Sequence, residues 1–244
     1  MKKITNYIVS GWKAYSLYVG FFLLGGALCF LPFLVSQRYF PLTMGDSWIK
    51  RLPIQCWELF FIAGLSLAAL TALRGKKPGF DELFAGFRHM GDLAGYLLIT
   101  LLSSARSFWW VGMHYPETWP YKSVVLTVLS LFGIFLLINL MFTLYLITDR
   151  RLSWIQAVIQ SWRMILPRWF AILLLTAICD FSFLLVDLVL KHRVVPTQGW
   201  AALFISLIWL IWPLKLCIVG AAYLDIAGET GGEAKPVCEP TLTV

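Results

Sequence analysis

Charged residues are scarce in this chain. Only 14% of its 244 residues are Asp, Glu, Lys or Arg, whereas soluble globular proteins carry about 25%. The chain is instead 59% hydrophobic, with a mean hydropathy of +0.77. A soluble domain of this length would need far more charge on its surface, so the composition predicts a protein that is surrounded by lipid.

The sequence also lacks the motifs of the common hydrolytic and phosphoryl-transfer enzymes. It has no glycine-rich phosphate loop, no G-x-S-x-G and no H-E-x-x-H, and its polar segments are too short to form a soluble catalytic domain. The five cysteines form no C-x-x-C pattern, and the three histidines fall in separate segments. We therefore expect no enzyme, no metal site and no cofactor; a catalytic site would have to lie within the membrane.

Six apolar runs are long enough to cross a bilayer as helices, since about 20 residues span a hydrocarbon core about 30 Å thick. Backbone groups in lipid must be paired within the segment, and the runs are too long and too uniformly apolar for barrel strands. The predicted spans cover residues 16–35, 53–73, 93–113, 124–148, 169–190 and 200–224. The predicted class is an all-α polytopic membrane protein, with a single domain over 1–225.

The basic residues predict the orientation of these spans. The net charge of +7 forms no basic run with interleaved aromatics, so we expect no nucleic-acid partner. With both termini in the cytoplasm, twelve bases fall on the cytoplasmic side and six outside, in agreement with the positive-inside rule. The cytoplasmic bases are Lys2, Lys3, Lys13, Arg74, Lys76, Lys77, Arg88, Arg150, Arg151, Arg163, Arg168 and Lys235.

A short pattern recurs three times at an offset of 75 residues. Gly11-Trp12-Lys13 corresponds to Gly86-Phe87-Arg88 and to Ser161-Trp162-Arg163. The residues just upstream agree at the same offset, as Ile8-Val9, Leu83-Phe84 and Val158-Ile159. The repeat predicts three two-span units over about 4–74, 79–149 and 154–225, with Trp12, Phe87 and Trp162 and the adjacent bases in corresponding places at the cytoplasmic interface.

An amphipathic linker helix is predicted at the start of each unit. Apolar residues at 80, 83, 84 and 87 follow helical spacing, and Trp154, Ile155, Val158, Ile159 and Trp162 repeat the pattern with Ser153 as N-cap. Such helices belong at the membrane interface. They fit two roles, a structural elbow between spans or a surface that recruits lipid.

Four ionisable residues lie inside the predicted spans, where a charge is costly. Asp180 and Lys215 fall at similar depths, about 14–17 Å from the cytoplasmic ends of consecutive spans, which predicts a pair. Glu58 and Arg106 form a second candidate pair in the outer half, although Arg106 is also long enough to reach the interface. Each pair fits a structural staple between helices or part of a transport pathway.

The two ends of the chain differ from the rest. Lys2 and Lys3 before an apolar run resemble the start of a signal peptide, but the run is long and its upstream helix is one copy of the repeat, so we expect it to be retained. From residue 226 onward the composition turns to Gly, Pro and Glu, which predicts a disordered cytoplasmic tail over 226–244.

The segments Leu83-Phe84-Ala85-Gly86-Phe87-Arg88 and Leu144 to Ser153, followed by Ser161-Trp162-Arg163 and Pro167-Arg168-Trp169, resemble a family of uncharacterised six-span bacterial inner-membrane proteins. That family is similar in turn to the membrane domain of some glycerophosphodiester phosphodiesterases. The resemblance implies a multi-pass protein of the bacterial inner membrane and carries over no catalytic residue, because this sequence lacks the soluble phosphodiesterase domain.

These observations favour a non-enzymatic integral membrane protein that binds lipid or a membrane partner in envelope homeostasis. The alternative is a small transporter or permease that uses the charged residues of spans five and six, Asp180 and Lys215. The expected partners of the protein are membrane lipids and another membrane protein, with no nucleic acid.

Overall fold

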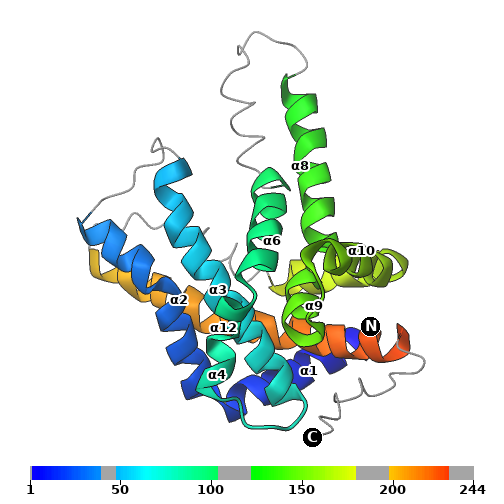
Figure 1. Cartoon of the computed structure of the whole chain (residues 1–244), viewed down its shortest axis with the longest axis horizontal. Coiled ribbons are helices and arrows are strands. Elements are labelled where there is room, and N and C mark those ends of the chain that lie inside the picture. The colour runs from blue at the N-terminus through cyan, green and yellow to red at the C-terminus, as the bar shows by residue number, and fades with distance from the viewer. Residues whose placement is uncertain (1, 40–47, 104–121, 180–197, 231–244) are drawn as a thin grey trace, which may run out of the picture.

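The computed structural model describes residues 2–39, 48–103, 122–179 and 198–230, and every regular element among them is helical (Figure 1). The predicted all-α class is confirmed for this part of the chain. The elements are α1 (Lys2–Leu17), α2 (Val19–Tyr39), α3 (Trp48–Leu73), α4 (Phe80–Leu83), α5 (Ala85–Arg88), α6 (Met90–Ser103), α8 (Lys122–Asn139), α9 (Thr143–Arg150), α10 (Trp154–Ile165), the 3-10 turn η1 (Leu166–Arg168), helical residues 169–179, and α12 (Gln198–Thr230).

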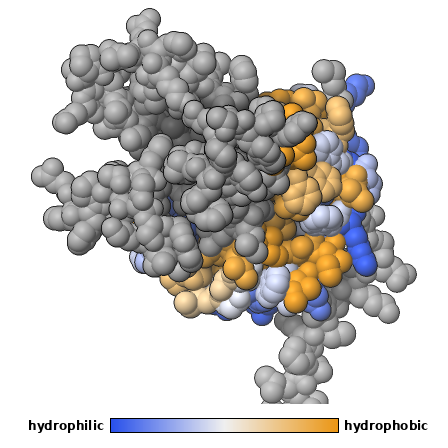
Figure 2. Space-filling model, turned by 90° about the horizontal axis from the view of Figure 1, so that it is seen from above, coloured by the Kyte–Doolittle hydropathy of each residue, from blue (hydrophilic) through white to orange (hydrophobic). Residues whose placement is uncertain are grey.

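Three described helical segments are long and apolar enough to cross a membrane. They are Pro53–Leu73, Leu131–Arg150 and Trp154–Cys179, and the bent pair α1 and α2 makes a fourth if it is one span. Many large apolar side chains on these helices are exposed, and Figure 2 shows hydrophobic residues over much of the described surface on one face. Exposed apolar area of this extent suits contact with lipid.

Two predicted spans differ in detail from the helices that form. The chain bends by 88° between α1 and α2, so the apolar helix begins at Val19 and residues 16–17 belong to α1. The predicted span 124–148 is interrupted by a turn at 140–142, after which α9 continues to Arg150. Sequence periodicity did not locate either break, because the apolar composition continues through both.

The prediction of one continuous helix over 80–88 is wrong. This segment forms two short helices, α4 and α5, with Phe84 between them. The reason is close packing against α3. A Cβ atom at Gly64 would overlap the Leu83 carbonyl, and one at Gly86 would overlap the Phe60 carbonyl. The two backbones therefore touch at two places, and the linker bends at Phe84 between them. Leu83 is buried, whereas Phe80 and Phe84 are exposed.

The predicted N-cap position of Ser153 is confirmed, but the capping hydrogen bond comes from another residue. Ser153 occupies the N-cap position of α10, but its side chain makes no capping hydrogen bond. The first backbone N–H of the helix, that of Trp154, donates instead to the Asp92 carboxylate of α6 at 3.1 Å. The indole of Trp154 covers Gly95 one turn further along α6. A carboxylate near a helix N-terminus is favoured by the helix dipole, so α6 supplies the cap.

The last helix is longer than the predicted span. α12 runs through Thr230, past the predicted start of the disordered tail at residue 226, and Ile226 and Ala227 are buried. These residues remain helical because α1 packs along this end of α12, where the two helices lie side by side (Figure 1). Residues 231–244 lie outside the described part.

The core lies where α3, α9 and α12 meet. The rings of Tyr145 and Tyr223 stack with their centroids 5.4 Å apart, and Phe142 packs edge-on against Tyr223 at 5.7 Å. The Tyr145 hydroxyl donates to the Leu216 carbonyl at 2.8 Å, so this buried phenol has a partner. Helices from the start, middle and end of the sequence thus share one core.

Candidate functional site

A charged junction joins the ends of the three core helices. We use this name for Arg74, Asp149, Tyr223, Asp225, Tyr7 and Lys3. The Arg74 guanidinium donates to both carboxylate oxygens of Asp149, at 2.6 and 2.8 Å, and the Tyr223 hydroxyl donates to the same carboxylate at 3.2 Å. A two-pronged contact of this kind fixes orientation as well as charge.

The helix ends position these side chains. Gly75 has φ +76°, its N–H donates to the Ala72 carbonyl, and the N–H of Lys76 donates to the Thr71 carbonyl, so α3 ends at Leu73, directly before Arg74. α9 ends in a similar way at Arg151, which has φ 52°. This left-handed backbone conformation is unfavourable for residues other than glycine, asparagine and aspartate. Both helix ends therefore turn sharply beside the Arg74–Asp149 contact.

The second part of the junction fastens α1 to α12. The Tyr7 hydroxyl donates to Asp225 at 2.6 Å, and Lys3 lies 3.6 Å from the same carboxylate. Burial, the hydrogen bond to Asp225 and the negative charge of that carboxylate together raise the pKa of Tyr7 to about 12. Tyr7 is therefore a neutral donor at physiological pH.

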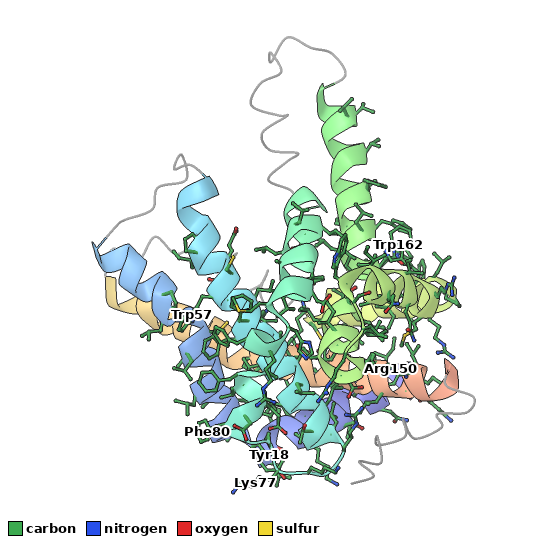
Figure 3. The ribbon with its side chains drawn as sticks, in the orientation of Figure 1. Tyr18, Trp57, Lys77, Phe80, Arg150 and Trp162 are labelled. Carbon is green, nitrogen blue, oxygen red and sulfur yellow. The ribbon has the colours of Figure 1, made fainter. Side chains whose placement is uncertain are left out.

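The junction is electrostatically balanced by its bases. Asp149 and Asp225 lie toward the C-terminal ends of their helices, where the helix dipole disfavours a negative charge. Arg74 and Lys3 offset that cost, and the hydrogen bond to Asp149 is the main reason why the pKa of Arg74 is raised. Arg150, labelled in Figure 3, directly follows Asp149 at the end of α9.

Chemically, the junction can hold helices together, because its two bases and two acids are paired with each other. Its acids are occupied by hydrogen bonds, and the described residues contain no group of three or more His, Cys, Asp or Glu side chains able to hold a metal ion. Several other bases of the described residues are exposed and so can meet an anion from outside. These are Lys2, Lys13, Lys76, Lys77, Arg88, Arg150, Arg151 and Arg163.

The small residue in each copy of the sequence pattern packs against another helix. Gly11 of α1 lies against the backbone of Ile218 in α12, where a Cβ atom would not fit. Gly86 of α5 lies against Phe60 of α3, and the buried Ser161 hydroxyl of α10 donates to the Asn139 carbonyl of α8 at 2.6 Å. All three contacts bring a linker helix onto the backbone of a long apolar helix.

The aromatic residues that follow differ in their surroundings. Trp12 is 57% exposed on α1. Phe87 packs among Trp57, Phe60 and Phe61, with ring centroids between 4.9 and 6.2 Å apart. Trp162, labelled on α10 in Figure 3, packs edge-on against Phe135 at 5.8 Å. The next residue in each copy, Lys13, Arg88 or Arg163, is exposed.

Only one residue of each predicted intramembrane pair lies within the described part of the chain. Asp180 and Arg106 lie outside it, so both pairs stay predictions. Lys215 on α12 and Glu58 on α3 are half-buried. The backbone carbonyl of Glu58 accepts a hydrogen bond from Cys29 Sγ at 3.5 Å, which links α2 to α3.

Sequence reasoning missed the charged junction. Asp149 stands alone among bases after an apolar run, and an isolated acid at a helix C-terminus is a signal that a base from elsewhere must pair with it. The identity of that base, Arg74, and the role of Tyr7 depend on contacts between distant helices.

No known protein family, curated protein or solved structure matches this chain. What the protein does must therefore be inferred from its own residues.

Proposed function

We propose that this chain is a six-span, non-enzymatic protein of the bacterial inner membrane that binds anionic lipid headgroups at its cytoplasmic face. In this topology both termini are cytoplasmic. The apolar helices support a membrane location. The choice of the bacterial inner membrane rests only on the resemblance of the linker segments given in the sequence analysis. The lipid function is supported by the exposed bases that lie beside exposed apolar side chains.

The charge balance of this face is the observation that carries the proposal. Of the described residues that the topology assigns to the cytoplasmic side, eleven are Lys or Arg and six are Asp or Glu. Two of the acids, Asp149 and Asp225, are paired with two of the bases, Arg74 and Lys3, within the charged junction. The other nine bases still outnumber the other four acids. The surplus of positive charge therefore remains available, and basic residues next to a membrane attract anionic lipids.

We further propose that the chain consists of three two-span units arranged as a closed ring. Gly11, Gly86 and Ser161 are spaced by 75 residues, and the residues on which they pack, Phe60, Asn139 and Ile218, are spaced by 79. Each linker helix would then dock on the second helix of the preceding unit. α1 would dock on the last unit, in agreement with its position along α12.

Mass spectrometry of the protein after gentle detergent extraction tests the lipid proposal. We expect phosphatidylglycerol or cardiolipin to remain bound in excess of their share of the membrane. Retention of lipids only in their bulk proportions would contradict the proposal.

A second candidate, a small transporter, is favoured by the break between α8 and α9. Asn139 and Thr143 flank this break, both fully buried, and Asn139 Oδ1 and Thr143 Oγ1 have no hydrogen-bond partner among the described residues. Interrupted helices with free polar groups often line solute sites in transporters. Proton-coupled flux in liposomes that disappears in Asn139→Leu would favour this candidate, and absence of flux would favour lipid binding alone.

A further inference from the structure

The three bases of the repeated pattern share a common structural setting. Lys13, Arg88 and Arg163 are exposed, and none of them forms an ion pair with another described residue. Two positions earlier, Gly11, Gly86 and Ser161 are buried against a neighbouring helix. Because the small residue fixes the inward side of the linker, the base two positions later is held on the outward side.

An exposed apolar residue lies four positions before each of these bases. Val9 is 59% exposed, Phe84 is 47% exposed and Ile159 is 49% exposed. In a helix, residues four apart lie on the same face, as Val9 and Lys13 do in α1 and Ile159 and Arg163 do in α10. The linkers α1 and α10 therefore each offer an apolar side chain and an unpaired positive charge on one helix face, and in the second linker Phe84 directly precedes α5, which ends at Arg88.

This pairing matches the chemistry of an anionic phospholipid. Its phosphodiester carries a negative charge for the base, and the acyl chain beside it offers apolar contact. A soluble anion would gain nothing from the apolar residue, and a zwitterionic lipid would gain less from the charge.

We propose three equivalent anionic-phospholipid sites, one on each linker helix, formed by Val9 with Lys13, Phe84 with Arg88, and Ile159 with Arg163. This inference rests on the proposed lipid function and specifies where and how many lipids bind. The phosphate contacts the base, and the first part of the acyl chain lies over the apolar residue.

Native mass spectrometry of the full-length protein with added phosphatidylglycerol counts the bound lipids directly. We expect up to three tightly bound molecules for the wild type and up to two for Lys13→Gln, Arg88→Gln or Arg163→Gln, with affinity at the altered site about fivefold lower. The triple variant should retain none. Lys76→Gln is the matched control, because it removes an exposed base of the same face outside the pattern, and it should retain three.

The outcomes separate this inference from the broader proposal. A wild type that retains no anionic lipid overturns both. If the wild type retains lipid and the Arg163→Gln and Lys76→Gln variants lose it to the same extent, the three sites are overturned and general electrostatic binding remains. Displacement of the lipid by millimolar inorganic phosphate would identify free phosphate as the ligand and contradict the lipid sites. Arg163→Lys should restore the third molecule, which excludes misfolding as the cause of its loss.

Discussion

At the scale of single residues, the contact between Arg74 and Asp149 decides how the core helices are joined. It links the end of α3 to the end of α9, and Tyr223 adds α12 through the same carboxylate. Asp149 is mostly buried, while Arg74 remains partly exposed to solvent. Removing one partner of this contact should therefore cost more than it does in an exposed ion pair, at most about 1 kcal/mol, and less than it does in a fully buried pair, about 3–5 kcal/mol.

Asp149→Asn should lower the thermal stability of the detergent-solubilised protein, by about 1–3 kcal/mol, because the Arg74 charge loses its partner. The double variant Asp149→Asn with Arg74→Met should recover part of that loss, since it leaves no orphaned charge. Thermal unfolding followed by circular dichroism measures both. Equal stability of the wild type and the Asp149→Asn variant would mean that the contact between Arg74 and Asp149 does not stabilise the fold.

At the scale of elements, glycine positions report which helices must approach closely. Gly11 in α1 and Gly20 in α2 both lie within helices, but only Gly11 faces a backbone, that of Ile218. A Cβ atom at Gly20 meets nothing within 4 Å. Alanine substitutions at these two glycines should therefore change the stability of the protein in opposite directions.

Gly20→Ala should raise stability by up to about 1 kcal/mol, because alanine favours the helix. Gly11→Ala should lower it by about 1–3 kcal/mol, because α1 must move away from α12. Hydrogen exchange in detergent should show faster exchange in α1 of the Gly11 variant and unchanged exchange in the Gly20 variant. Protection of α1 in both variants would remove the evidence that α1 docks on α12 through Gly11.

The sequence predicted the elements better than their junctions. Apolar runs predicted helices that the described part of the chain contains, because a segment in lipid must pair its backbone groups internally. The bend after Leu17, the turn at 140–142 and the division of 80–88 depend on contacts between helices, which periodicity does not encode. The same holds for the charged junction, whose members come from the two ends and the middle of the sequence.

The candidate site was predicted in part. Lys13, Arg88 and Arg163 follow from the repeated pattern, and their exposure agrees with an interfacial position. The burial of Gly11, Gly86 and Ser161 was not foreseen, because a small residue in an amphipathic segment is equally compatible with exposure. The pairs Asp180 with Lys215 and Glu58 with Arg106 stay predictions.

At the scale of the whole molecule, the account depends on one face being cytoplasmic. The charged junction, the exposed bases and the three proposed lipid sites all belong to that face if the helices cross the membrane six times. The anionic lipids of the inner leaflet would then meet the surplus of bases. With the opposite orientation the same residues would face the outside, and the lipid proposal would lose its electrostatic basis.

Topology mapping with reporter fusions tests this central claim most directly. Fusions after residue 244 and near residues 79 and 153 should report a cytoplasmic location, and fusions near residues 45, 116 and 197 should report the outside. A cytoplasmic report from any of the last three, or an outside report from any of the first three, would contradict the six-span arrangement and the inward orientation of the basic face.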